Sequence, residues 1–168
     1  MRYMFLTHDV NELTKKGSGM LFEKELRETT EFYVEEKRKE QVCKEKAAQI
    51  EKLHLLFGQV CGKHTKDFQT FFNTKFYRTE ETVSTYELSI HDKVTKLELV
   101  SQLDGDYMTV ILRVDSYASN KYSVEQLDRN ENNTLDSLEV AEEKMEKMLK
   151  KAFKLAYNPG FYLLSEAK

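Results

Sequence analysis

The chain has 168 residues, with 26 Lys and Arg against 29 Asp and Glu, and a net charge of −3. Hydrophobic residues make up 40% and charged residues 33%, a balance too apolar for a disordered chain and too polar for a membrane protein. Nucleic acid is a disfavoured partner, because its binding normally requires a basic face. With only two cysteines, Cys43 and Cys61, and no signal peptide, we expect a cytoplasmic protein.

Residues 20–72 are predicted to be helical, either as one helix with a break or as two helices. The region has no proline and is rich in residues that favour helices. An apolar stripe begins with Phe22, Leu26, Tyr33 and Val34. A second series at helical spacing is typical of a buried face: Ala47, Ile50, Leu53, His54, Phe57, Val60 and Cys61. Too few apolar positions precede Ala47 to predict a coiled coil.

Residues 31–46 form a charged arm within this helical region. Every position from 35 to 40 carries a charge, so this part has no apolar face to bury. It is either a plain solvated helix or an arm that reaches a partner. We take Glu35, Arg38, Lys39 and Glu45 as candidate partner-binding residues. Another protein is the expected partner, and a homo-oligomer through the N-terminal helix is an alternative.

Residues 82–127 predict an antiparallel β-meander of three or four strands. Asp104-Gly105 is typical of a two-residue hairpin turn, because both residue types tolerate positive φ. We place a second turn at Asp92-Lys93 and a fourth strand at 121–127, after a turn near Ser119-Asn120. These two turns give the following pairs: Ser101 with Met108, Leu99 with Val110, Leu97 with Leu112, Ile90 with Thr95, Leu88 with Leu97, and Tyr86 with Leu99. Both hairpins bury the same face, and a shift of one residue would destroy that agreement.

Residues 135–157 predict an amphipathic helix whose apolar side packs on the sheet. Its acidic residues come first and its lysines last, which complements the helix dipole. Attachment to a membrane surface or to a partner groove is the alternative. The whole chain, residues 1–168, is therefore predicted to be a single α+β domain: a helical N-terminal half, a three- to four-stranded antiparallel meander and a C-terminal amphipathic helix on the sheet.

Residues 128–139 resemble the twelve-residue calcium loop of the EF-hand family. Calcium binds six to eight hard oxygens in such a loop. The resemblance implies six ligands: Asp128, Asn130, Asn132, Thr134 through its carbonyl, Asp136, and Glu139 in bidentate fashion. The sixth position holds Asn133 where the family has glycine, and no second loop follows. The alternative is a polar loop that leads into the helix, with Asn133 or Thr134 as its cap.

His54, Cys61 and His64 are the other candidate ligands, since imidazole and thiolate suit zinc. The alternative is a cysteine packed in the core beside a half-exposed histidine. A nucleophile–base pair of Cys61 and His64 would lack both an orienting acid and an oxyanion hole.

No phosphate loop, nucleophile elbow or paired metal-binding histidine motif is present. We therefore expect a non-enzymatic protein-interaction or regulatory protein without a cofactor, with a calcium-binding protein as the alternative. A composition rich in Lys, Glu and Asn, with one proline and no tryptophan, suits an AT-rich bacterial or phage genome. A phage protein that modulates a host target is the specific form of this expectation.

Overall fold

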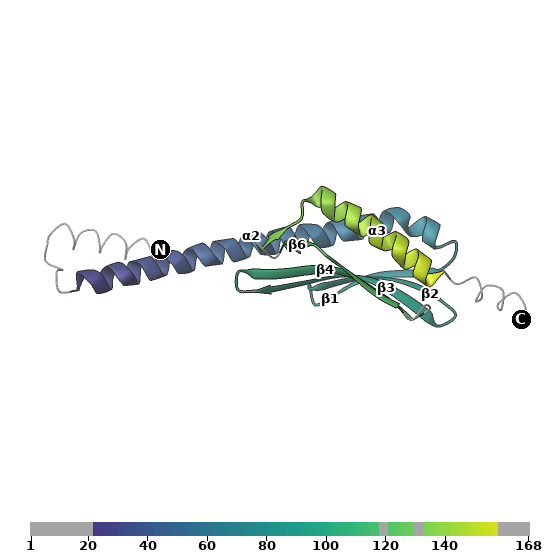
Figure 1. The fold of residues 1–168 in the computed structure, drawn as a ribbon, viewed down its shortest axis with the longest axis horizontal. Helices are drawn as coiled ribbons and strands as arrows, with labels where there is room; N and C mark the ends of the chain where they lie inside the picture. The colour runs from purple at the N-terminus through teal and green to yellow at the C-terminus, as the bar shows by residue number, and fades with distance from the viewer. Residues whose placement is uncertain (1–21, 118–120, 130–132, 158–168) are drawn as a thin grey trace, which may run out of the picture. The chain divides into compact units, whose positions relative to one another are not determined.

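A computed structural model describes residues 22–117, 121–129 and 133–157 (Figure 1). The chain forms a long N-terminal helix, an antiparallel sheet and a C-terminal helix that packs on the sheet. This confirms the predicted α+β class. The elements are α2 (Glu23–Phe68), β1 (Asn73–Thr79), β2 (Val83–Ile90), β3 (Lys93–Asp104), β4 (Tyr107–Ser116), β5 (Lys121–Gln126), β6 (Asp128–Arg129), β7 (Thr134–Leu135) and α3 (Leu138–Ala156).

The main sheet has five strands in the order β1-β2-β3-β4-β5, and all neighbours are antiparallel. The predicted meander of β2, β3 and β4 and the predicted fourth strand, β5, are therefore present. Strand β1 is one more than the sequence predicted. It escaped prediction because only Phe76 and Tyr77, which are adjacent, are apolar in it, so no alternation marks it as a strand.

The hairpin of β3 and β4 is shifted by two residues from the predicted pairing. Leu99 lies opposite Leu112 rather than Val110, and Asp104 is the last paired residue of β3. The turn therefore begins at Gly105, whose φ of 61° suits a residue without a side chain. Because a shift of two residues keeps each side chain on its own face, the predicted buried face is still right.

The hairpin of β2 and β3 is corrected in the same way. Tyr86 lies opposite Leu97 rather than Leu99, because the turn residues are His91 and Asp92. Both have positive φ, 47° and 65°, as a tight two-residue turn requires. The polar Asp was recognised as a turn residue, but histidine was not expected in this conformation.

The core lies between one face of the sheet and two helical segments. Figure 1 shows α3 and residues 46–68 of α2 side by side on this face. The large buried side chains come from both helices and from the sheet, and include Leu53, Phe57, Tyr86, Leu97, Leu99, Leu112, Met145 and Leu149. On the opposite face Glu98 accepts hydrogen bonds from Thr85 and Arg113, both at 3.0 Å. Polar side chains on that face therefore satisfy part of one another's hydrogen-bonding capacity.

The ends and the continuity of the helices follow local chemistry. Helix α2 runs unbroken through Gly58 and Gly62, so the region forms one helix. A glycine in a helix costs only about 1 kcal/mol, less than the packing of a buried helical face contributes. Helix α3 begins after Ser137, whose hydroxyl accepts the N–H of Val140 at 3.3 Å. The predicted cap at Asn133 or Thr134 was therefore wrong.

The chain divides into two compact units, Met1–Glu45 and Lys46–Lys168, and the boundary lies inside α2. Among the described residues, every buried apolar side chain belongs to the second unit. The α2 residues of the first unit, 23–45, include none that is buried. Neither described helix is long and apolar enough to cross a membrane. The single domain over residues 1–168 stays a prediction.

Truncation of a core side chain tests this layering. Leu112 is 0% exposed, so Leu112→Ala should lower the free energy of unfolding by about 2–5 kcal/mol. Val124 on β5 is 45% exposed, and Val124→Ala should cost less than about 1 kcal/mol. Urea unfolding of both variants measures the difference, and equal losses would contradict the assignment of the faces.

Candidate functional site

The four predicted partner-binding residues lie on residues 23–45 of α2, here called the exposed segment. Arg38 pairs with Glu35 through two bonds, Nη2 to Oε1 at 2.6 Å and Nε to Oε2 at 3.1 Å. This hydrogen bond lowers the pKa of Glu35 below its ordinary value. Gln41 donates to Glu45 at 3.3 Å, and Lys39 is exposed. Some of these charged side chains therefore already have hydrogen-bond partners within the same helix.

The exposed segment also carries apolar side chains that the sequence-based site did not include. Phe32 is 61% exposed and Val34 57% exposed. Phe32 contacts the edge of Tyr33, with ring centroids 5.9 Å apart, and Leu26 is half-buried. The apolar stripe was visible in the sequence, but the charged run at 35–40 interrupts its helical periodicity, so the pattern did not mark these side chains as a binding surface.

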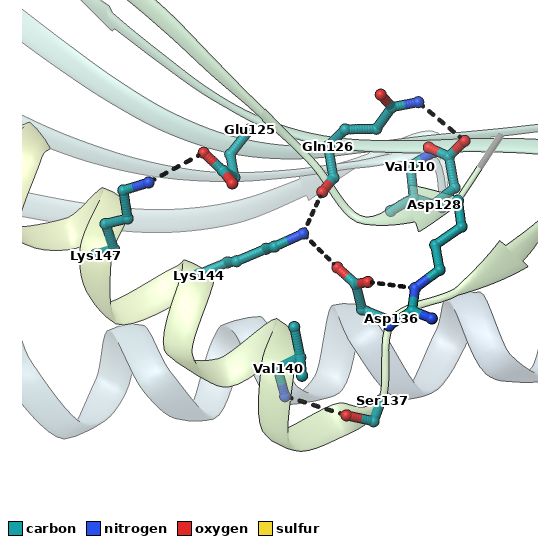
Figure 2. Close-up of polar contacts among 10 residues, drawn as sticks. Val110, Glu125, Gln126, Asp128, Asp136, Ser137, Val140, Lys144 and Lys147 are labelled. Carbon is teal, nitrogen blue, oxygen red and sulfur yellow. Dashed lines mark hydrogen bonds and ion pairs between the residues drawn. The ribbon is translucent and has the colours of Figure 1, made fainter.

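The predicted calcium loop is a short hairpin in the structure. Strands β6 and β7 pair Asp128 with Leu135 and Arg129 with Thr134. Two of the six implied ligands, Asn130 and Asn132, lie outside the described residues. Figure 2 shows the described part of this hairpin between β5 and the start of α3.

Both carboxylate oxygens of Asp128 already accept hydrogen bonds from the protein (Figure 2). Oδ1 accepts the backbone N–H of Val110 at 2.9 Å, and Oδ2 accepts the amide of Gln126 at 3.1 Å. Asp128 is only 6% exposed. A buried carboxylate needs such partners, so this aspartate fastens the hairpin to the backbone of β4.

Asp136 is held between two cations. Lys144 Nζ lies 2.6 Å from its Oδ2 and also donates to the Gln126 carbonyl at 2.8 Å (Figure 2). Arg129 Nε lies 3.5 Å from its Oδ1. The Asp136 side chain is 6% exposed, while Glu139 is exposed in the first turn of α3. Asp136 thus ties the start of α3 to the end of β5.

Asn133 adopts the left-handed conformation, with φ of 48°. Its amide binds the backbone of Met108 twice, accepting from the N–H and donating to the carbonyl, both at 3.0 Å. Its Oδ1 also accepts from Lys46 Nζ at 2.6 Å, and Lys46 donates to the carbonyl of Asp106. Asparagine suits this position because it tolerates positive φ and its amide can both donate and accept.

The candidate zinc ligands His54, Cys61 and His64 have separate partners. His54 is 3% exposed and lies between two serine hydroxyls, Ser84 at 2.7 Å from Nδ1 and Ser101 at 2.9 Å from Nε2. Ser101 donates its only hydroxyl proton to the Thr82 carbonyl at 3.2 Å. Ser101 therefore accepts from a protonated Nε2, and Ser84 donates to Nδ1.

Cys61 and His64 do not form a reactive pair. Cys61 is 1% exposed, and burial raises the pKa of its thiol above the ordinary value, with Glu146 adding to the shift. The thiol is therefore protonated near neutral pH. His64 Nε2 lies 2.7 Å from a carboxylate oxygen of Glu146. Across residues 22–117, 121–129 and 133–157, no three His, Cys, Asp or Glu side chains form a group that could hold a metal.

A groove between α2 and α3 was not expected from the sequence. Its volume is about 1090 Å³, and Lys63, Glu142 and Lys151 are among its lining residues. A smaller neighbouring pocket of about 350 Å³ is aromatic, since Phe71 and Phe153 line it and their ring centroids lie 5.6 Å apart. The neighbouring phenylalanines 71 and 72 signalled an apolar cluster, but only the pairing of two helices distant in sequence creates the groove.

The buried histidine makes stability depend on pH. The pKa of His54 is lowered to about 4, mainly by burial, with the charge of Arg78 adding to the shift and that of Glu51 opposing it. Below pH 6.5 the His54 imidazole becomes protonated in the unfolded chain, whereas in the folded chain it stays neutral down to about pH 4. Stability therefore falls as the pH falls through this range. Between pH 6.5 and pH 4, the free energy of unfolding of the wild-type protein should fall by up to about 3 kcal/mol more than that of His54→Gln.

This pH dependence is measured by urea unfolding of both proteins at several pH values. The carboxylates titrate equally in the two proteins, so the difference between them reports on His54. Parallel curves between pH 6.5 and 4 would contradict a neutral, buried His54.

The calcium loop stays a prediction, and calorimetry with calcium tests it. The resemblance predicts heat of binding that is lost in Glu139→Gln, because this residue would supply two oxygens. Glu143→Gln, an exposed glutamate one turn later, should leave the heat unchanged. No heat at about 1 mM calcium, the weak end for such loops, would overturn the resemblance.

No family model, no curated protein and no solved structure matches this chain. Function is therefore inferred below from the contacts, exposure and charge of the chain's own residues.

Proposed function

We propose that the protein is a non-enzymatic interaction protein and that its partner protein binds the exposed segment, residues 23–45 of α2. The observation that carries this proposal is a helical stretch of about six turns without a buried residue, which nevertheless presents Phe32 and Val34 to solvent. Most helices in proteins are stabilised by packing of an apolar face. Within the described residues, this segment has no such packing.

A partner that covers this segment gains free energy from its apolar side chains. Full burial of an exposed Phe or Val contributes about 1.5–3 kcal/mol. The cost of ordering is small, because the segment is continuous with the packed part of α2. The charged side chains Glu35, Arg38, Lys39 and Glu45 would then select the partner and speed encounter more than they would add affinity.

The composition extends the proposal to a regulatory role in the cytoplasm. The abundance of Lys, Glu and Asn and the single proline suit a phage or bacterial genome, so a host protein is the proposed partner. This part rests on composition, and the identity of a captured partner tests it.

A second candidate function is calcium binding by residues 128–139. One observation favours it: Asn133 has φ of 48° at the sixth position, where the EF-hand loop requires a sharp turn. Binding would have to release Asp128 from Val110 and Asp136 from Lys144. Calcium affinity would therefore be weak.

Truncation of the exposed apolar side chains tests the interaction proposal. The tagged full chain is used to capture its partner, and the double variant Phe32→Ala, Val34→Ala should bind at least about tenfold more weakly. Alanine favours helices more than Phe or Val, so loss of helix would not explain the result. The matched control is Tyr122→Ala, Val124→Ala, which removes two exposed side chains of β5.

The charged residues provide a second comparison in the same assay. Charge reversal at Glu35, Arg38, Lys39 and Glu45 should weaken capture, and more strongly at low ionic strength. Capture of the partner unchanged by both the apolar and the charge variants would overturn the exposed segment as the binding surface.

A further inference from the structure

The smaller pocket beside the groove, here called the aromatic pocket, lies where the C-terminal ends of α2 and α3 meet. Its volume is about 350 Å³, and three of its lining residues are phenylalanines, Phe68, Phe71 and Phe153. The ring centroids of Phe68 and Phe71 lie 5.8 and 5.6 Å from that of Phe153. All three belong to the unit Lys46–Lys168, so the aromatic pocket and the exposed segment are built from different parts of the chain.

The charged residues that line the aromatic pocket balance one another. Lys150 and Lys154 contribute two positive charges, and Asp67 and Glu146 contribute two negative charges. His64, which also lines the pocket, lies 2.7 Å from Glu146. An occupant with a net charge of either sign therefore gains little here, whereas an uncharged apolar segment can bury its side chains against the aromatic rings.

The chain supplies an uncharged apolar segment shortly after α3. Residues 161–164 are Phe, Tyr, Leu and Leu. Asn158-Pro159-Gly160 comes before them and is typical of a reverse turn, because proline suits the second position of such a turn and glycine the third. A turn here would direct residues 161–164 back toward α3. Residues 158–168 lie outside those that the structure describes, so this turn is a prediction from the sequence.

The described end of α3 lies beside the aromatic pocket. The ring of Tyr157 stacks on that of Phe153, with centroids 5.7 Å apart, and meets the ring of Phe71 edge-on at 5.6 Å. Phe153 precedes Tyr157 by one helical turn, about 6 Å along the axis. Phe161 follows Tyr157 by four residues, which span up to about 14 Å when extended. The aromatic pocket is therefore within reach of Phe161.

We propose that residues 161–164 dock in the aromatic pocket of the same chain, with Phe161 against Phe71 and Phe153. The segment is joined to the end of α3 by a short connection, so its effective concentration at the pocket is high. Docked in this way, it covers Phe71, which is 40% exposed, and competes with any other apolar segment for the aromatic pocket.

Chymotrypsin cleavage of the full chain tests the docking. The protease cuts after aromatic residues and leucine in chain that is free to extend, so cleavage after residues 161–164 reports the undocked fraction. Phe71→Ala removes one ring of the pocket and should raise this cleavage rate about tenfold. Equal rates in the wild type and in Phe71→Ala would overturn the proposal.

The matched control for this variant is Phe76→Ala on β1. Phe76 is 44% exposed, close to the value for Phe71, and its ring also contacts a core phenylalanine, Phe57, at 5.9 Å. It is not among the residues that line the aromatic pocket. Phe76→Ala should therefore leave cleavage after residues 161–164 at the wild-type rate, which separates loss of the pocket from general destabilisation.

A tryptophan reporter measures the burial of position 161. The chain contains no tryptophan, so Phe161→Trp introduces a single one. Its emission should lie at a shorter wavelength than that of Tyr122→Trp, whose position is 61% exposed, and acrylamide should quench it less. Adding Phe71→Ala to the reporter should shift the emission to a longer wavelength. Equal quenching of the two tryptophans would contradict docking.

A synthetic peptide of residues 158–168 tests the identity of the occupant. The full-chain variant Phe161→Asp, Leu164→Asp leaves the aromatic pocket open, so it should bind the peptide at least about tenfold more tightly than the wild-type chain. The control variant Asn158→Asp, Ser165→Asp adds the same charge but keeps the apolar run, so it should bind the peptide as weakly as the wild type. Equal binding by all three chains, or binding by none, would overturn the proposal.

Protein concentration separates docking within one chain from docking between two copies. Docking within one chain predicts that the cleavage rate and the tryptophan emission do not change with protein concentration. Protection that increases with concentration would assign the aromatic pocket to the segment of a second copy and overturn the proposal. None of these measurements involves the exposed segment, so failure of this inference would leave the proposed function standing.

Discussion

The structure depends on covering one apolar face of a five-stranded sheet. Strands β2, β3 and β4 alternate so that Leu97, Leu99 and Leu112 point the same way, and burial of these side chains is the main source of stability. Residues 46–68 of α2 and the whole of α3 provide the cover (Figure 1). Because only the second half of α2 packs on the sheet, residues 23–45 have no buried side chain. The absence of buried side chains in that segment is thus a consequence of how the core is closed.

The oxygen-bearing side chains between β5 and α3 are of a type that can bind a cation or accept hydrogen bonds from the protein. Asp128, Asn133 and Asp136 would suit a cation, but in the structure each meets a donor of the protein itself: the N–H of Val110, the backbone of Met108 and the ammonium of Lys144. A buried carboxylate is costly without such donors. These contacts fix where α3 begins and so how it lies on the sheet. His54 follows the same rule, since two serine hydroxyls satisfy both of its ring nitrogens.

The proposed function depends on surface charge and exposed apolar area rather than on a reactive centre. The thiol of Cys61 is buried and protonated, and His64 is engaged with Glu146. The exposed segment combines the two features that protein interfaces use, large apolar side chains and charges of both signs.

The sequence by itself determined the fold class, the two helical regions, the meander and the buried face of β2, β3 and β4, because all of these follow from hydrophobic periodicity. It could not determine the pairing of Leu99 with Leu112, since a shift of two residues preserves that periodicity and is resolved by the turn at Gly105. Strand β1 carries no periodic signal and exists because β2 offers it a partner. The charges of Glu35, Arg38, Lys39 and Glu45 were evident from composition. Only the tertiary structure decided that residues 23–45 contribute nothing to the core, because burial depends on which other elements reach a given face.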